Sequence, residues 1–186
     1  MARLETERLY LREFEESDWE AVHQYGSDPE VVKFLAWGPN TKEDSRNFIR
    51  RAIGYEQQEP RKDYVLAVVL KAKGTLIGGC GIHLSKPNSR EGGISYCLNR
   101  HFWGRGYATE AARALLAFGF QEMGLHRIFA TCDVENLASA RVLEKVGMKR
   151  EGRLREHIWT KGRWRDSFLY AILEHQWQQM KSTSRG

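Results

Sequence analysis

A glycine-rich turn between a strand-like run and a helix-like run is the segment of the sequence best suited to chemistry. It reads Arg100-His-Phe-Trp-Gly-Arg-Gly-Tyr-Ala-Thr-Glu110. Gly104 and Gly106 let the backbone turn tightly and approach a ligand closely. The N–H groups of residues 105 to 109 then lie at a helix N-terminus, which favours an anion, and Arg105 adds a positive charge. The segment predicts a pyrophosphate cradle; the alternative is a turn that serves only chain geometry.

Two common nucleotide-binding signatures do not fit this segment. A Walker loop needs a lysine directly after its last glycine, and here Tyr107 follows Gly106. The dinucleotide fingerprint needs a further glycine or alanine where this chain has Thr109. The sequence therefore disfavours both of these nucleotide classes.

The same segment resembles the acetyl-CoA-binding motif of the GNAT superfamily of N-acetyltransferases, in the run Phe102-Trp-Gly-Arg-Gly-Tyr-Ala-Thr-Glu-Ala111. A second run is similar to the other half of that site in the RimJ/RimL-like branch: Asn136-Leu-Ala-Ser-Ala-Arg-Val-Leu-Glu-Lys-Val-Gly-Met148. Further positions that fit this branch are Thr6 to Arg12, Arg127, Glu151-Gly152, Gly162 and Asp166. One departure is Trp103, which stands where the family pattern often has Gln or Arg.

The resemblance implies an acetyl-CoA-dependent N-acetyltransferase with no metal and no covalent enzyme intermediate. In the family, the acetyl-pantetheine arm lies between two splayed central strands. A backbone N–H on residues 94 to 98 is then expected to polarise the thioester oxygen. The residues expected to contact the cofactor are Tyr96, Cys97, Leu98, Trp103, Gly104, Arg105, Gly106, Tyr107, Ala108, Thr109, Asn136, Ser139 and Arg141.

The resemblance leaves the proton donor and the base open. Many relatives use a tyrosine on the second motif helix as the acid; here the matching hydroxyl belongs to Ser139, which could protonate the thiolate or simply pack near the helix start. Relatives often have a glutamate at the position of Gly93. The candidate bases here are Glu91, two residues earlier on the same strand face, and His83 on the neighbouring strand. A chain of waters to solvent is the third possibility.

The expected acceptor is a primary amine, and the RimJ/RimL resemblance points to the α-amine of a protein N-terminus, such as a ribosomal protein. Phe34 and Trp37 are expected in the wall of the acceptor site, with the core as their alternative location. Small amines and antibiotics stay open as acceptors, because analogy of fold does not determine a substrate. A second hypothesis is a module that binds acyl-CoA or RNA without turnover, because the strand glutamate and the helix tyrosine of relatives are missing.

The elements that must position these residues follow from the pattern of apolar residues. Strands are expected at 9–14, 64–71, 76–84, 93–98, 127–133, 148–159 and 164–172, and helices at 17–26, 29–34, 41–58, 109–123, 136–146 and 173–180. The central strand–helix–strand order predicts a parallel pair with a right-handed crossover, and the hairpins predict antiparallel pairs. We expect one α+β domain over residues 1–186, of the GNAT fold. It should have a mixed, mostly antiparallel sheet of about six to seven strands, helices on both faces and a central β-α-β-α cofactor site.

Composition limits the protein class. The 186 residues are 41% hydrophobic and 28% charged, which is typical of a globular protein and too apolar for a disordered one. No apolar run approaches the ~20 residues of a membrane span and no signal-peptide core is present, so we expect a soluble, cytoplasmic protein. Three cysteines without a CxxC pair predict neither disulfides nor zinc. Neither the net charge of +5 nor the basic run 149–166 is a firm sign of nucleic-acid binding. Monomer and homodimer are both open.

Overall fold

Eight strands form one sheet in the computed structural model, which describes residues 3–86 and 89–183. The order across the sheet is β1-β2-β3-β4-β5-β6-β8-β7, and every neighbouring pair is antiparallel except β5 and β6. The strands are β1 Arg3–Glu5, β2 Leu9–Glu13, β3 Asp63–Leu70, β4 Thr75–Leu84, β5 Glu91–Leu98, β6 Arg127–Asp133, β7 Lys149–Thr160 and β8 Arg163–Leu173. The expected fold class is confirmed. The strand beyond the expected seven is β1, whose three residues are too few for a periodicity signal.

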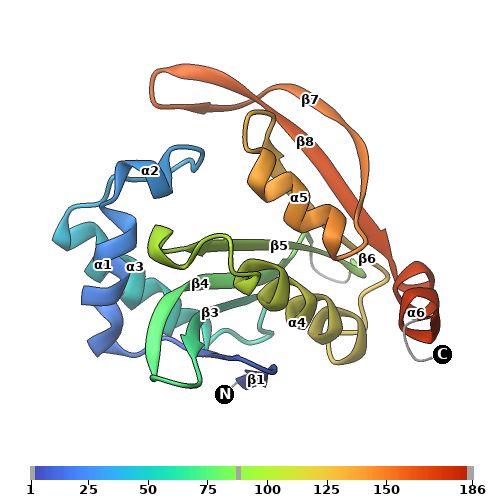
Figure 1. The fold of residues 1–186 in the computed structure, drawn as a ribbon, viewed down its shortest axis with the longest axis horizontal. Coiled ribbons are helices and arrows are strands. Elements are labelled where there is room, and N and C mark those ends of the chain that lie inside the picture. The colour runs from blue at the N-terminus through green and yellow to red at the C-terminus, as the bar shows by residue number, and fades with distance from the viewer. Residues whose placement is uncertain (1–2, 87–88, 184–186) are drawn as a thin grey trace.

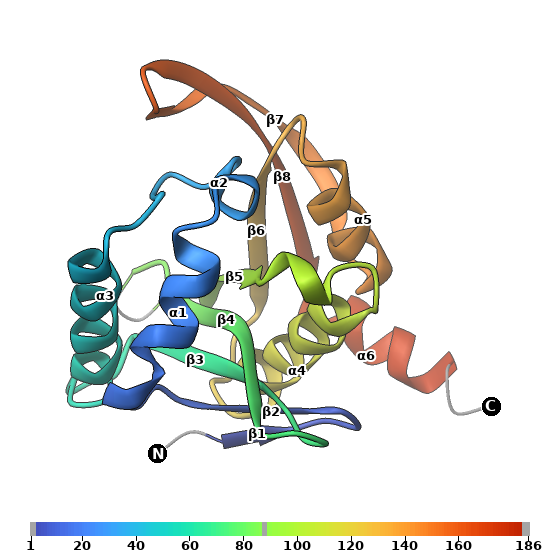
Figure 2. The same cartoon turned by 60° about the vertical axis from the view of Figure 1, so that its left-hand side comes forward.

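Helices cover both faces of the sheet (Figure 1, Figure 2). Helices α1 and α3 lie on one face, and α4, α5 and α6 lie on the other (Figure 2). The helices are α1 Trp19–Gly26, α2 Pro29–Val32, α3 Lys42–Tyr55, α4 Tyr107–Gln121, α5 Leu137–Lys145 and α6 Glu174–Thr183, with 3-10 turns at Glu16–Asp18 and Arg100–Phe102. Among the residues that the structure describes, no helix is long and apolar enough to cross a membrane.

Helix starts agree with the capping chemistry of the sequence. Thr41 begins α3 in a capping box, in which its hydroxyl accepts the Asp44 N–H and the Asp44 carboxylate accepts the Thr41 N–H. Asn136 begins α5, and its side-chain oxygen accepts the N–H of Ser139 at 3.1 Å. Both contacts join residues three positions apart, so the local sequence is enough to predict them.

The core has one apolar layer on each face of the sheet. Under α4 and α5 the fully buried residues include Leu66, Ile82, Leu115, Ile128 and Ile172. The layer under α1 and α3 is smaller and includes Phe14, Val22, Ile49, Ala67 and Val69. Side chains alternate along β5, so Ile94 and Leu98 belong to the first layer and Cys97 packs against the second.

The two parallel strands at the centre of the sheet separate after three residues. Strand β5 pairs with β6 only where Glu91, Gly92 and Gly93 lie opposite Arg127, Ile128 and Phe129. Beyond Gly93, β5 continues along β4 and β6 continues along β8. The free edge of β5 therefore faces a gap that opens toward the glycine-rich turn, which follows directly after β5.

Candidate active site

The glycine-rich turn has the backbone that an anion cradle requires. Gly104 and Gly106 have φ angles of +72° and +81°, in the left-handed region that favours glycine. Gly106 is the N-cap of the 15-residue helix α4, and its carbonyl accepts the N–H of Glu110. The indole N–H of Trp103 donates to the Leu98 carbonyl at 2.8 Å and closes the turn. The N–H groups of residues 107–109, in the first turn of α4, have no acceptor among the described residues and are available to a ligand.

A cavity of about 730 Å³ connects this turn to the gap between β5 and β6. Its walls come from β5, β6 and α5 and, at the far end, from α2 and the β7–β8 hairpin. The hairpin reaches α2 through Arg165, which donates to the Lys33 carbonyl at 2.9 Å. An anionic group fits the turn, and an extended arm fits the unpaired edge of β5, so these residues suit acetyl-CoA.

Most of the residues predicted to contact the cofactor line this cavity. They are Tyr96, Cys97, Leu98, Trp103, Gly104, Gly106, Ala108, Thr109, Asn136, Ser139 and Arg141. Arg105 and Tyr107 do not line it: the Arg105 guanidinium lies 5.9 Å from the Phe102 ring centre, and the Tyr107 ring lies under Arg8. Contact of any of these residues with a cofactor stays a prediction.

Ser139 has a partner that sequence reasoning missed. The hydroxyls of Tyr96 and Ser139 are 2.9 Å apart, with either able to donate, and the Ser139 carbonyl accepts from the Tyr96 hydroxyl at 3.2 Å. Burial raises the pKa of Tyr96 well above its usual value, against the smaller opposite effect of the hydrogen bond to Ser139. Tyr96 therefore keeps its proton. The predicted role of Tyr96 involved only its backbone, because nothing in the sequence shows that β5 faces α5.

Glu91, one of the two candidate bases, is held in an ion pair. Its carboxylate accepts from Arg127 at 2.9 Å, directly across the short parallel pairing of β5 with β6, and Arg127 also pairs with Glu151. Glu91 lines neither of the two main cavities of the described chain. Its position suits the assembly of the sheet better than proton transfer.

His83, the other candidate base, lies over Gly93. The two residues are partners in the β4–β5 pairing, and a Cβ atom built on Gly93 would lie 2.7 Å and 2.8 Å from the imidazole Cε1 and Nε2. The imidazole edge meets Phe129, with ring centres 6.3 Å apart and planes at 85°. Within the described residues, no hydrogen bond or ion pair engages either ring nitrogen of His83. The imidazole thus occupies the space that a side chain at position 93 would fill, where β5 and β6 part.

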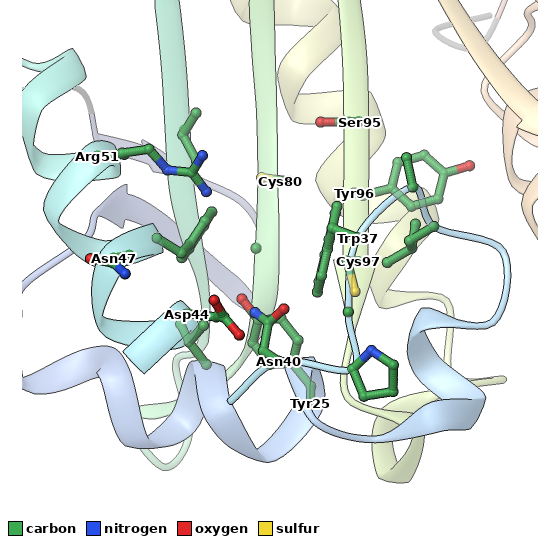
Figure 3. Close-up of a pocket in the computed structure, with 18 of the residues that line it drawn as sticks. Tyr25, Trp37, Asn40, Asp44, Asn47, Arg51, Cys80, Ser95, Tyr96 and Cys97 are labelled. Carbon is green, nitrogen blue, oxygen red and sulfur yellow. The ribbon is translucent and has the colours of Figure 1, made fainter. Parts of the chain in front are cut away.

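A second cavity of about 1140 Å³ lies on the α1 and α3 side of the sheet. Trp37 lines it, whereas Phe34 lines the first cavity. Figure 3 shows its wall of α3 side chains on one side and Ser95, Tyr96 and Cys97 of β5 on the other. The two cavities share the residues Leu35, Ala36, Ser95, Tyr96 and Cys97. Two ligands can therefore meet at the middle of β5.

The three cysteines have environments that oppose thiolate formation. Burial raises the pKa of Cys80 and Cys97 to about 12 and the pKa of Cys132 to about 11. Nucleophilic cysteines have a lowered pKa instead. These side chains pack as small apolar groups.

The glycine-rich turn is tied to the N-terminal segment through Glu110. Its carboxylate accepts from the Thr6 hydroxyl at 2.5 Å, from the Arg8 N–H at 2.8 Å and from the Arg8 side chain at 2.7 Å. Arg8 also donates to the Arg105 carbonyl at 3.0 Å. Residues more than 95 positions apart form this contact, so only the tertiary structure reveals it.

Replacing Glu110 with alanine should lower the melting temperature by about 4–8 °C at pH 7, because losing these charge-assisted hydrogen bonds costs about 2 kcal/mol. Partial burial raises the pKa of Glu110, but the hydrogen bonds from Thr6 and Arg8 outweigh it, so its pKa is lowered from 4.5. The contribution is therefore complete above about pH 4.5 and disappears as the pH falls through the lowered value. Thermal unfolding at several pH values measures it. The control is Glu122→Ala at the other end of α4; an equal effect of both variants would contradict the assignment.

Comparison with known proteins agrees with this geometry. A family model described as an acetyltransferase (GNAT) domain matches residues 8–149. The uncharacterized N-acetyltransferase YnaD of Bacillus subtilis is 40% identical over 172 residues, which are 92% of this chain and 97% of that protein. The solved structure of a GNAT-family acetyltransferase from Bacillus anthracis is 41% identical, with a TM-score of 0.83 over 94% of this chain and 99% of that one.

A more distant structural match contains coenzyme A. It is RimL, described as a ribosomal L7/L12 alpha-N-protein acetyltransferase in complex with coenzyme A. The TM-score is 0.82 over 92% of this chain and 98% of that one, and the identity is 21%. At this identity the likeness concerns the fold alone.

Proposed function

The chain belongs to the GNAT family of acetyltransferases, and from this membership we propose that it transfers an acetyl group from acetyl-CoA to the α-amine of a protein or peptide N-terminus. Membership makes it an N-acetyltransferase. Acetyl-CoA, when bound, supplies the acetyl group as a thioester. The acceptor, the acting residues and the direct route in a ternary complex are the parts that we propose.

The junction of the two cavities at Ser95, Tyr96 and Cys97 is the observation that supports direct transfer. A thioester held along the free edge of β5 and an amine entering from the α3 side meet there without a carrier on the enzyme. Holding two reactants in one geometry removes much of the entropic part of a barrier. The raised pKa values of Cys80, Cys97 and Cys132 speak against an acyl-cysteine intermediate.

His83 is the base in this proposal, and Ser139, oriented by Tyr96, is the proton donor. The imidazole lines the first cavity where β5 and β6 part, and its ring nitrogens, which have no hydrogen-bond partner among the described residues, can take the proton of the amine. Ser139, on α5, donates its hydroxyl proton to the departing sulfur and regains a proton from solvent water, while Tyr96 orients its hydroxyl. A backbone N–H of β5 beyond Gly93 polarises the thioester oxygen.

An α-amine is the acceptor that these groups suit best. Its ordinary pKa of about 8 leaves a useful neutral fraction near pH 7.5, whereas a lysine amine near 10.4 requires stronger help. A polyamine would need free carboxylates. Among the described residues that line the second cavity, Asp44 has the one carboxylate. This carboxylate already accepts hydrogen bonds from the N–H and the hydroxyl of Thr41. The open second cavity has room for a peptide, and the name of the RimL match, an alpha-N-protein acetyltransferase, agrees with such an acceptor.

The acceptor is tested by following CoA release with matched peptides. We expect turnover of peptides with a free N-terminus and none of the same peptides with a blocked N-terminus and an internal lysine. Mass spectrometry of the product should locate one acetyl group on the first residue. Acetylation of lysine or of polyamines at higher kcat/KM would contradict the α-amine proposal. Tight acetyl-CoA binding without release in the whole panel would favour a binding module.

A further inference from the structure

Helix α3 presents a polar strip to the second cavity. Asp44, Asn47 and Arg51 recur at intervals of three and four residues, so they lie on one side of the helix. Figure 3 shows Asn47 and Arg51 across the cavity from Ser95, Tyr96 and Cys97, with the strand of Cys80 between them. A molecule that reaches β5 from this side therefore passes the strip.

The charges of the strip have partners with one exception. Asp44 accepts from Thr41, which lowers its pKa, and the neighbouring Arg50 pairs with Glu43 at 2.5 Å. Arg46, one turn earlier, stacks over Trp19 outside the cavity. Arg51 forms no ion pair, hydrogen bond or cation–π contact with any residue that the structure describes. Its guanidinium is a positive charge in the cavity wall that lacks an anion.

Two uncharged donors accompany Arg51. The side-chain amides of Asn40 and Asn47 also line the cavity, and neither forms a hydrogen bond with the described part of the chain. A guanidinium provides a planar fork of donors that matches a carboxylate, and amide N–H groups supply further hydrogen bonds. The chemistry of this wall suits a carboxylate.

The distance across the sheet limits where that carboxylate can lie on the acceptor. Helix α3 packs on β3, whereas the cavities meet on β5, two strands away. Adjacent strands are about 4.8 Å apart, so this separation is about 10 Å. An extended peptide advances about 3.3–3.6 Å per residue. An acidic side chain on the second or third residue of an extended acceptor suits this strand separation.

We propose that Arg51, with Asn40 and Asn47, selects acceptors that have a carboxylate two or three residues from the reacting α-amine. The inference rests on the proposed α-amine acceptor and adds a sequence preference to it. The carboxylate can come from an acidic side chain in a protein N-terminus or from the free C-terminus of a tripeptide.

The test compares C-terminally amidated peptides that differ only in glutamate or glutamine at the third position. We expect kcat/KM to be about 10- to 100-fold higher for the glutamate peptide, the range typical of hydrogen bonds to charged groups. Arg51→Ala should bring this ratio close to one, and Arg51→Glu should reverse it in favour of a lysine peptide. Arg46→Ala, on the same helix outside the cavity, should keep the wild-type ratio.

Further measurements distinguish a side-chain carboxylate from a C-terminal carboxylate. They also distinguish failure of the Arg51 inference from failure of the α-amine proposal. A neutral tripeptide with a free C-terminus, measured against its amide, reports whether small peptides use the same site. Turnover of neutral and acidic peptides at equal kcat/KM, or a preference that survives Arg51→Ala, overturns the Arg51 inference and leaves the α-amine proposal intact. Absence of turnover with every peptide, in a protein that binds acetyl-CoA, overturns the α-amine proposal, and this inference falls with it.

Discussion

Replacing Gly106 with glutamate should weaken acetyl-CoA binding at least about 100-fold, which corresponds to about 2.7 kcal/mol. Two effects act together. The residue has a φ angle of +81°, where a side chain costs about 1–2 kcal/mol, and the new carboxylate stands at the N-terminus of α4, where the pyrophosphate is expected. Titration calorimetry with acetyl-CoA measures the change directly.

Two variants separate backbone strain from charge at this position. Gly124 also has a positive φ angle, of +64°, and open space around a Cβ atom, but it does not line the first cavity. Gly124→Glu therefore has similar backbone strain and should bind acetyl-CoA normally. Gly106→Ala adds the backbone strain without the charge. Its Cβ atom would approach only the Arg8 side chain, at 3.4 Å, so this variant should show an intermediate loss of affinity for acetyl-CoA. Binding by Gly106→Glu within threefold of wild type would contradict the anion cradle.

Replacing His83 with glutamine should lower kcat about 100-fold or more at saturating acetyl-CoA, since a positioned general base contributes about 10²–10⁴. A general base must be unprotonated to act, so the wild-type rate should have an acidic limb. In the variant this limb should disappear, leaving only the dependence that comes from the acceptor amine near pH 8. Pre-steady-state and steady-state rates across pH 5.5–9 measure both effects. The affinity for acetyl-CoA should change little.

The packing of His83 on Gly93 offers an independent test. A methyl group at position 93 would lie 2.7–2.8 Å from the imidazole and must displace it, so Gly93→Ala should reproduce much of the loss without touching the histidine. His175 is an exposed histidine on α6 that lines neither cavity, and His175→Gln should be silent. If His83→Gln and Gly93→Ala retained wild-type kcat and the acidic limb, water or another group would be the base.

The parts of the site that the sequence predicts are those made by short-range contacts. A pair of glycines before a helix places backbone N–H groups within five residues, and the Asn136 cap reaches only to Ser139. Such geometry follows from φ and ψ angles and from side chains three positions apart, so the motif residues and the local structure agree. The apolar periodicity likewise predicts seven of the eight strands and the central crossover.

The choice between Glu91 and His83 illustrates what local sequence cannot determine. Both lie on strands with suitable spacing, and both side chains can accept a proton. The pairing of β5 with β6 brings Arg127 to Glu91, and the pairing of β4 with β5 lays His83 over Gly93. The sheet register therefore places Glu91 in an ion pair with Arg127, whereas His83 lines the first cavity with no ion pair or hydrogen bond to its ring among the described residues.

The sequence by itself determined the family, the fold class and the position of the glycine-rich turn, because these depend on motifs and periodicities contained in contiguous segments. Only the tertiary structure decided which side chains face each other across the cleft. The Tyr96–Ser139 contact and the attachment of Glu110 to Arg8 join residues 43 and 102 positions apart. The placement of Arg51 opposite β5, without a charged partner in the part of the chain that the structure describes, depends on the packing of α3 on the sheet. Such contacts arise when burial of the two apolar layers brings distant segments together, so no local pattern specifies them.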